Sequence, residues 1–292
     1  MATSGTILAV DIGGTKLAVG RVDAAGVLTD RRSAPTPARG GPEPMWERLV
    51  ELVAAVRRGD EATVGVGCGG PMEPDGRTVS PLNIPAWTGF PLHERLAELT
   101  DLPVHIDNDA KALALGEGWV GAARGVRDFI ALVVSTGVGG GIVLDGRLLD
   151  GAAGNAGHIG HVIVEPDGRT CGCGARGCLE AEASGTGIRA ATGAAPAEAG
   201  EAVRRRTGTL VGRAVASVVN LLDLRLAVVA GSVALGYGEP FFVAAQAEID
   251  ARCRIEFARG ARIVPAGLGD AGPLVGAAAV GLRGEGHDVG VA

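Results

Sequence analysis

The sequence predicts an α/β protein made of two lobes. Short apolar runs typical of strands alternate with longer segments of helical periodicity, and this alternation is characteristic of α/β folds. The chain has 292 residues, which is long for a single core, so two lobes of ordinary size are expected. A strand, a glycine-rich turn and a second strand occur twice in that order, around residues 11–15 and 135–141. We interpret this repeated order of elements as a duplicated lobe architecture rather than a sequence repeat.

The first lobe is predicted to begin with a meander of three strands, because turn-forming residues separate three short apolar runs. After a segment with several prolines, helices and strands alternate. The expected elements are strands at 7–11, 16–22 and 27–34, a helix at 42–58, a strand at 64–67, a helix at 92–99, a strand at 104–106 and a helix at 110–120.

The second lobe is predicted to repeat the strand, turn and strand before it becomes mainly helical. The linker is placed near 116–125, which gives an N-terminal lobe of residues 1–117 and a C-terminal lobe of residues 118–272. A helix within 273–292 is expected to pack back on the N-terminal lobe. The expected elements are strands at 129–134 and 142–144, helices at 197–206 and 210–222, a strand at 226–230, and helices at 239–251 and 273–282.

Composition and charge exclude several classes of protein. Apolar residues make up 47% of the chain and charged residues 21%, which is a globular composition rather than a disordered one. The net charge of −6 argues against a nucleic-acid partner, since such proteins need a basic face. No apolar run is long enough to span a bilayer, and the start lacks the features of a secretion signal. We therefore expect a cytoplasmic protein with no membrane partner.

Two glycine-rich segments have the chemistry of phosphate-binding loops. In residues 11–16, Gly13 and Gly14 permit a sharp turn that brings backbone N–H groups against phosphate oxygens, while Thr15 and Lys16 add a hydroxyl and a positive charge. Asp11, at the end of a strand, could hold magnesium through water. An ordinary hairpin turn explains this segment almost as well.

The segment at 135–141 is the second such loop, and two loops in different lobes could clamp one triphosphate across a cleft. A third segment, at 230–236, follows a strand and precedes a helix, so a nucleotide could lie against its backbone. An ordinary strand–helix turn accounts equally well for this third segment.

Residues 107–109, Asp-Asn-Asp, lie between a predicted strand and a predicted helix. Ligands of open α/β sheets gather at the carboxyl ends of strands, where a carboxylate could take the proton of an attacking hydroxyl. Asn108 could orient a hydroxyl by donating and accepting hydrogen bonds. Asp and Asn are also common helix N-caps, and without other evidence capping is the favoured explanation for this triplet.

A cluster of cysteines indicates a structural zinc site. Three thiolates and one imidazole make a closed tetrahedral ligand set, and the intervening glycines allow tight turns around one metal. Redox or incidental cysteines are the competing explanation. Cys68 and Cys253 are isolated and are interpreted as core or loop thiols. The predicted zinc ligands are His161, Cys171, Cys173 and Cys178.

Two polar residues flank this cluster. His158 precedes His161 by three positions, and Glu180 follows Cys178 by two. A metal would hold the segment rigid, so these side chains would be well placed to bind a ligand. A loop histidine with no function is the alternative for His158.

Taken together and in order, these motifs resemble the ROK family of bacterial glucokinases, fructokinases, N-acetylmannosamine kinases and sugar-responsive repressors. The resemblance covers nearly the whole chain, and the cysteine motif with the Asn-Asp pair is its most specific part. The segments that carry it are Asp11-Ile-Gly-Gly-Thr-Lys16, Asp107-Asn-Asp-Ala110, Ser135-Thr-Gly-Val-Gly-Gly-Gly141, Gly157-His-Ile-Gly-His161 and Cys171-Gly-Cys-Gly-Ala-Arg-Gly-Cys-Leu-Glu180.

The resemblance implies an actin-like ATPase (ribonuclease H-like) fold, with two α/β lobes around a cleft, and transfer of the ATP γ-phosphate to a sugar hydroxyl, usually O6 of a hexose. It implies Mg²⁺, structural Zn²⁺ and a homodimer or homotetramer, with polyphosphate as an open alternative to ATP. Asp109 would be the catalytic base. Sugar-binding residues would be Gly70, Asn83, Asn108, Asp109, His158, His161 and Glu180, with His161 using one ring nitrogen for sugar and one for zinc. Phosphate, magnesium and nucleoside would be bound by Asp11, Gly13, Gly14, Thr15, Lys16, Thr136, Gly137 and Gly231.

One residue departs from the glucokinase pattern of the family. Glucokinases that this chain resembles usually carry Glu three residues before the zinc histidine, whereas the residue here is His158, as in bacterial N-acetylmannosamine kinases. Glucose is the leading substrate on the resemblance and N-acetylmannosamine the next. A repressor of the family would carry an added N-terminal helix-turn-helix domain, and the first phosphate-loop strand here begins already at Thr6. A sugar-binding protein without catalysis would be expected to lack Asp109 or a glycine loop.

Overall fold

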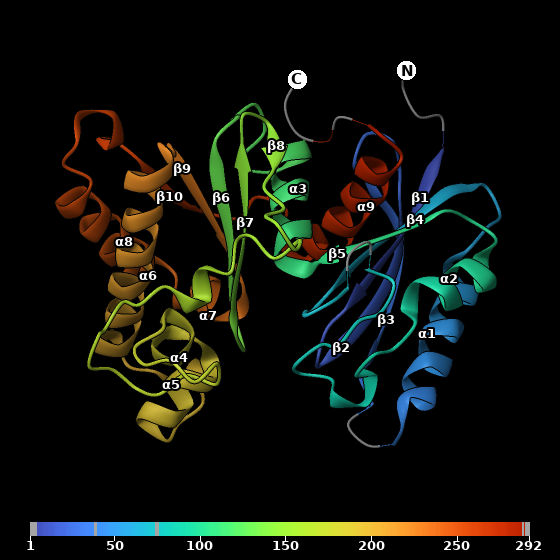
Figure 1. The fold of residues 1–292 in the computed structure, drawn as a ribbon, viewed down its shortest axis with the longest axis horizontal. Coiled ribbons are helices and arrows are strands. Elements are labelled where there is room, and N and C mark those ends of the chain that lie inside the picture. Colours follow the sequence, from blue (N-terminus) through green and yellow to red (C-terminus); the bar gives the residue numbers. More distant parts are fainter. Residues whose placement is uncertain (1–4, 38–39, 74–75, 288, 290–292) are drawn as a thin grey trace. The chain divides into compact units, whose positions relative to one another are not determined.

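Each of two units of the chain is built around one five-stranded sheet, in a computed structural model that describes residues 5–37, 40–73, 76–287 and 289 (Figure 1). The first unit consists of the described residues within Met1–Gly125, Ala152–Asn155 and Leu268–Ala292. The second unit consists of Val126–Gly151 and Ala156–Gly267. Both units combine a sheet with helices, so the predicted α/β class is confirmed.

The sheet of the first unit joins an antiparallel meander to two parallel strands. β1 pairs antiparallel with β2, β2 pairs antiparallel with β3, and on the other side β1 and β5 both run parallel to β4. The order is β3-β2-β1-β4-β5. The strands are β1 (Thr6–Ile12), β2 (Lys16–Val22), β3 (Leu28–Pro35), β4 (Glu61–Cys68) and β5 (Val104–Asn108).

Helices cover this first sheet, and one of them comes from the far end of the described chain. The helix α9 packs against α3 and against β4 and β1. Its backbone approaches β4 so closely that a Cβ on Gly65 would lie 2.0 Å from the carbonyl oxygen of Ala277, so only glycine fits at that position. The helices are α1 (Pro42–Val56), α2 (Leu92–Thr100), α3 (Asp109–Val120) and α9 (Gly272–Gly284), with 3₁₀ turns η2 (Pro85–Trp87) and η6 (Gly269–Ala271).

The sheet of the second unit has the same topology. Its meander is β6-β7-β8, and β9 and β10 extend the sheet parallel to β6, in the order β10-β9-β6-β7-β8. The duplicated architecture predicted from the repeated strand, turn and strand is therefore present in the topology. The strands are β6 (Phe129–Val134), β7 (Val138–Leu144), β8 (Arg147–Leu148), β9 (Leu226–Ala230) and β10 (Arg262–Pro265).

The helices of the second unit share a core with its sheet, which includes Leu132, Val211, Val229 and Phe241. The most extensive helix packing is between α6 and α8. No helix within the described residues is both long enough and apolar enough to cross a membrane. The helices are α4 (Leu179–Ala183), α5 (Gly185–Thr192), α6 (Glu201–Leu222), α7 (Ser232–Tyr237) and α8 (Glu239–Arg252), with 3₁₀ turns η3 (Ile159–His161), η4 (Pro196–Glu198) and η5 (Glu256–Ala258).

Two sequence predictions for the second unit differ from the structure. The helices expected at 197–206 and 210–222 are one helix, α6, which continues through Gly208; a Cβ there would lie 2.2 Å from the carbonyl oxygen of Phe241. The strand expected at 142–144 begins already at Val138, because the glycines at 139–141 pair with β6. The second glycine loop is therefore a short turn at 135–137 followed by a glycine-rich strand.

Candidate functional site

The predicted residues of the first unit gather at one edge of its sheet. β1, β4 and β5 run parallel, so their carboxyl ends lie together. The register aligns Asp11 with Gly67 and Gly67 with Asp107, which places the end of β1 beside the start of α3. A polar ligand at this edge would meet the side chains of Asp11 on β1 and Asn108 on β5, on either side of Gly67 on β4.

The first glycine loop is the hairpin turn between β1 and β2. The Gly13 N–H donates to the carbonyl of Lys16 over 3.0 Å, which closes the turn. The side chain of Asn83 lies directly against it, since a Cβ on Gly14 would be 2.7 Å from Asn83 Nδ2. On its other side the Asn83 amide faces Gly69, whose Cβ would be 3.4 Å from Oδ1. The structure thus joins Asn83 to the first glycine loop, although 69 positions of sequence separate Asn83 from Gly14.

The side chains of the triplet at 107–109 make different contacts. Asp107 is ion-paired with Lys111 at 2.8 Å and with Arg283 at 3.4 Å. Asn108 is the N-cap of α3, and its Oδ1 accepts from the Ala110 N–H over 3.0 Å. The capping explanation is therefore right for Asn108, and the Nδ2 end of its amide lies toward Gly70, at 3.6 Å from a Cβ built there.

Asp109 occupies the first helical position of α3 with its side chain exposed. Its Oδ1 accepts from the Ala110 N–H over 2.8 Å, which fixes the carboxylate at the helix N-terminus. Burial, and next the negative charge of Asp109, raise the pKa of Asp11 to about 7, while Lys16 lowers it. Two carboxyl groups that repel one another in this way favour protonation of one of them or a bound cation.

The second glycine loop is held by the segment that follows the cysteines. Glu180 Oε2 accepts from the Val138 N–H over 3.1 Å, and a Cβ on Gly137 would be 2.9 Å from the same oxygen. The Thr186 hydroxyl donates to the carbonyl of Thr136 over 3.0 Å. The turn is therefore supported from α4 on one side and α5 on the other.

A cavity of about 440 Å³ lies beside this turn, wholly within the second unit. The third glycine loop borders it: the Ser232 and Ser135 hydroxyls are 3.0 Å apart, and Gly231 has φ of 101°, which favours glycine. Tyr237 lines the cavity and is 3% exposed, and its hydroxyl has no hydrogen-bond partner among the described residues. Other lining residues are Thr136, Thr186, Arg189, Pro196 and Gly236.

Sequence reasoning did not single out Thr186, Arg189 or Tyr237. A signal existed for the first of these. Ser184 caps α5 by accepting from the Gly187 N–H over 3.0 Å, and a serine before a glycine-rich helix start is typical of such a cap. The cavity itself depends on the packing of η4 against both α5 and α7, which no local pattern predicts.

The four predicted zinc ligands come together in the structure, with their ligand atoms all within 4.8 Å of one another. Cys171 Sγ is 3.8 Å from His161 Nδ1, and Cys173 Sγ is 3.8 Å from Cys178 Sγ. Zinc–sulfur bonds of about 2.3 Å in a tetrahedron place sulfurs about 3.8 Å apart, so the donor set fits zinc. Among the described residues this is the only such group of four donors.

The polar residues that flank the cluster lie around it. His161 turns Nδ1 toward Cys171, which leaves its Nε2 on the other side of the ring. The ring of His158 is 6.1 Å from that of His161, and the planes are inclined by 20°. The Leu179 N–H donates to the carbonyl of Val162 over 2.9 Å and ties α4, which carries Glu180, to the histidine segment.

Comparison with known proteins finds relatives along almost the whole chain. A model of the ROK family matches residues 7–283. The N-acetylmannosamine kinase of Citrobacter koseri is 42% identical over 246 residues, which is 79% of this chain and 84% of that protein.

Two solved structures agree over almost the full length. The ROK hexokinase from Thermus thermophilus has a TM-score of 0.81 and 35% identity, and the match covers 97% of this chain and 100% of that one. A ROK family glucokinase from Streptomyces griseus, solved in complex with glucose and AMPPNP, has a TM-score of 0.83 and 31% identity, over 96% of this chain and 100% of that one.

Proposed function

The chain belongs to the ROK family, and we propose that it transfers the γ-phosphate of ATP to a hydroxyl of a hexose, with O6 as the expected acceptor. The observation that carries the proposal is the placement of Asp109. Its exposed carboxylate stands at the start of α3, at the strand edge that also presents Asp11 and Asn108.

In the proposed reaction, Asp109 is the general base. It accepts the proton of the sugar hydroxyl while that oxygen bonds to the γ-phosphorus and the bond to the leaving ADP breaks. Asn108 donates from Nδ2, since its Oδ1 already accepts from the helix backbone. We assign the remaining sugar contacts to Gly70, Asn83, His158, His161 and Glu180.

We assign the binding of the phosphate donor, ATP, to both glycine turns and to the cavity beside the second turn. Residues 14–16, Thr136 and Gly137 would offer backbone N–H groups, hydroxyls and a positive charge to phosphate oxygens, while the Gly13 N–H closes the first turn. The cavity, with Gly231 and Ser232 at its border, would take the nucleoside. A buried hydroxyl without a partner is costly, so a nucleoside that satisfies Tyr237 would gain affinity that polyphosphate could not.

Two metal ions belong to the proposal. Asp11 would hold Mg²⁺, which supplies charge neutralisation for the phosphates. His161, Cys171, Cys173 and Cys178 would hold structural Zn²⁺. Three zinc thiolates need a reducing compartment, so we place the protein in the cytoplasm. We retain a homodimer or homotetramer as the expected assembly, which sedimentation would test.

The test is a panel of hexoses and amino sugars with Mg-ATP, in which ADP release is measured for the purified protein and for Asp109→Asn. We expect turnover with at least one sugar in the wild type alone. No ADP release with any sugar, or equal release by the variant, would contradict the proposal. Replacing ATP by polyphosphate in the same assay identifies the donor.

N-acetylmannosamine is a second candidate beside glucose, and His158 is the observation that favours it. An N-acetyl group presents a carbonyl oxygen that needs a donor, and imidazole can donate where a carboxylate cannot. The relative from Citrobacter koseri, an N-acetylmannosamine kinase, points to the same sugar.

The variant His158→Glu distinguishes the two sugars. If His158 recognises the N-acetyl group, this substitution should lower kcat/KM for N-acetylmannosamine by about tenfold, the size of one lost hydrogen bond. The value for glucose should hold or rise. A wild type that prefers glucose and loses none of that preference in the variant would leave glucose as the substrate.

A further inference from the structure

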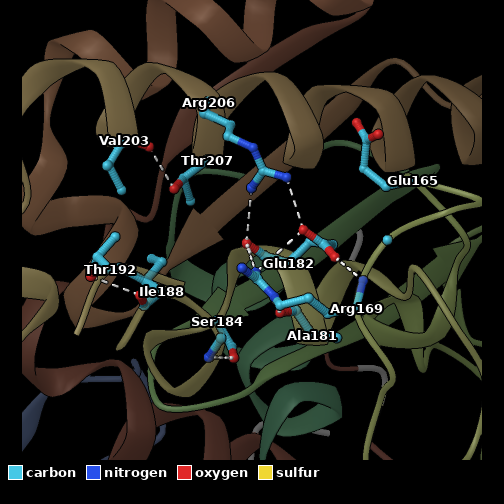
Figure 2. A network of polar contacts seen from close by, with 12 residues as sticks. Glu165, Arg169, Ala181, Glu182, Ser184, Ile188, Thr192, Val203, Arg206 and Thr207 are labelled. Carbon is cyan, nitrogen blue, oxygen red and sulfur yellow. Dashed lines mark hydrogen bonds and ion pairs between the residues drawn. The ribbon is translucent and has the colours of Figure 1, made fainter. Parts of the chain in front are cut away.

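Glu182 is a buried carboxylate on α4 that none of the proposed sugar, phosphate or metal contacts uses. It is 3% exposed and forms ion pairs with Arg206 at 2.8 Å and with Arg169 at 3.3 Å. It also accepts from the Arg169 backbone N–H over 2.6 Å. Figure 2 shows its carboxylate directed at the Arg206 side chain, which descends from α6, and at the backbone of Arg169.

The helix that carries Glu182, α4, is too short to be stable on its own. α4 spans only Leu179–Ala183, which is far shorter than any helix that is stable alone. Its N-cap is Cys178, one of the four clustered metal ligands. At its other end, the Arg169 guanidinium donates to the carbonyl of Ala181 over 2.7 Å and to that of Glu182 over 3.1 Å. The helix therefore follows a proposed metal ligand at its N-terminal end and is bound by a side chain from outside it at its C-terminal end.

Glu180 and Glu182 project from opposite faces of this short helix. Two positions turn an α-helix by about 200°, so the two carboxylates diverge. Glu182 faces Arg169 and Arg206, whereas Glu180 reaches the Val138 N–H at the second glycine turn. Whatever fixes the rotation of α4 about its axis therefore fixes where the Glu180 carboxylate lies.

Arg169 connects this anchor to the cysteines. It precedes Cys171 by two residues, and its backbone carbonyl accepts from the Gly177 N–H over 2.9 Å, directly before Cys178. The ion pairs of Glu182 thus tie α4 to the base of the cysteine hairpin and to α6 without involving any metal ligand.

We propose that Glu182 is a positioning residue for the sugar site: its ion pairs with Arg169 and Arg206 set the rotation of α4 and so aim Glu180 at its ligand. This inference rests on the proposed role of Glu180 in binding a sugar hydroxyl. It requires that Glu182 act through Glu180 and not through zinc or through general stability.

The test is a double-mutant cycle of Glu182→Gln and Glu180→Ala in the full-length, zinc-loaded protein. Glu182→Gln should raise the sugar KM about tenfold, the lower end for a lost hydrogen bond to a charged group, with kcat and the KM for ATP little changed. In the Glu180→Ala background the same substitution should change the sugar KM by less than about twofold, because the group it positions is absent. Equal effects in both backgrounds would overturn the proposal.

Glu61→Gln is the matched control. Glu61 is also a fully buried carboxylate paired with an arginine, Arg21, and it accepts from the Arg58 and Gly59 N–H groups at 2.8 and 2.9 Å. It lies in the first unit and contacts none of the proposed site residues. The variant Glu61→Gln should lower the stability of the protein as Glu182→Gln does but leave the sugar KM unchanged. A rise in the sugar KM of Glu61→Gln that matches the rise in Glu182→Gln would mean that Glu182 acts through stability alone.

A readout without turnover separates this inference from the proposed function. Amide hydrogen exchange at Val138 should accelerate at least fivefold or so in Glu182→Gln and remain unchanged in Glu61→Gln, because the Glu180 carboxylate that protects this amide moves. Zinc content should stay the same in both variants. If Glu182→Gln does not fold, Arg206→Gln, at a half-exposed side chain, carries the same predictions. Faster exchange without any kinase activity would refute the function alone, and unchanged exchange would refute the positioning role.

Discussion

The two units place a glycine turn at the same point of the same topology, but they support it differently. In the first unit the turn between β1 and β2 is supported from the residue after β3: the Thr36 hydroxyl donates to the carbonyl of Gly13 over 2.6 Å. In the second unit the turn between β6 and β7 is supported by α4 and α5, through Glu180 and Thr186. Those helices belong to the long segment between β8 and β9 that also holds the cysteine cluster.

This difference predicts how each of the two glycine turns responds to loss of the metal. The first turn is supported by Thr36 and contacted by Asn83, both residues of the first unit, so it should survive any change to the metal. The second turn depends on a segment whose helix begins at a metal ligand, Cys178, so metal loss should displace it together with Glu180. The comparison also predicts that Gly14→Ala in the first unit and Gly137→Ala in the second should raise the sugar KM to a similar extent.

The largest effect should come from the proposed general base, Asp109, which lies in the first unit. Asp109→Asn should lower kcat by about a thousandfold, within the range for loss of a general base, because an amide cannot take the hydroxyl proton. Sugar affinity by calorimetry and zinc content by metal analysis should be nearly unchanged. A variant that keeps most of its kcat would remove Asp109 as the base.

Removal of the metal ligands should have the next largest effect. The double variant Cys171→Ser and Cys173→Ser should lose zinc and raise the sugar KM about a hundredfold, the result expected when the hydrogen bonds of His161 and Glu180 are both misplaced. The measurements are metal content and steady-state kinetics.

Cys253→Ser is the control for this pair, because Cys253 is a buried cysteine of the same unit outside the cluster. It should retain zinc and the normal sugar KM. Zinc that remains bound in the double variant would contradict the assignment of the ligands.

A pair of glycine substitutions compares the two turns directly. A Cβ on Gly14 would lie 2.7 Å from Asn83 Nδ2, and a Cβ on Gly137 would lie 2.9 Å from Glu180 Oε2. Gly14→Ala and Gly137→Ala should each displace one proposed sugar contact and raise the sugar KM about tenfold, or about 1.4 kcal/mol. If zinc-dependent support matters only in the second unit, zinc chelation should worsen the KM of Gly14→Ala and leave that of Gly137→Ala closer to its starting value.

The smallest effect is a pH dependence in the first unit. The pKa of Asp11 is raised to about 7, so the folded state holds a proton there that the unfolded state releases near pH 4. The stabilisation that this proton gives is full below pH 4 and is lost as pH rises through 7. Without Mg²⁺, Asp11→Asn should therefore raise Tm relative to wild type at pH 8 by about 2–4 °C and much less at pH 5.

Mg²⁺ should make the ionised form of Asp11 favourable, so in the wild type, but not in Asp11→Asn, rising pH should strengthen the bound state. The cation needs the carboxylate form, so Mg-ATP should bind more tightly as pH rises from 6 to 8. Thermal melts and ATP titrations across this range provide the check. A pH profile that is the same for wild type and Asp11→Asn would mean that another group titrates.

Local patterns in the sequence predicted the strands of the first meander, β6 and β7 of the second meander but not β8, and the cysteine cluster, because turn residues and ligand spacing are short-range signals. They missed β10, α5 and α7, which are short elements stabilised by packing rather than by their own periodicity. They also divided α6 at Gly208, where a glycine that permits close contact with Phe241 resembles a helix break.

For the candidate site, the sequence named the residues but not their arrangement. That Asn83 lies against Gly14, or that Glu180 accepts from the Val138 N–H, depends on loop paths that no spacing encodes. The triplet at 107–109 is instructive, because capping and ligand binding were posed as alternatives. The structure shows one end of the Asn108 amide in the cap, and the other end lies toward Gly70.

The packing of α9 bears on how the protein is synthesised. This helix, at residues 272–284, covers β1 and β4, so the first unit lacks part of its core until the second has been made. A ribosome adds about 5–20 residues per second, so the segment between the units' boundaries delays completion by about 7–30 s. During that interval the apolar face of β1 and β4 is uncovered and open to chaperones or aggregation. We therefore expect the second unit to fold first on the ribosome, in the opposite order to the chain.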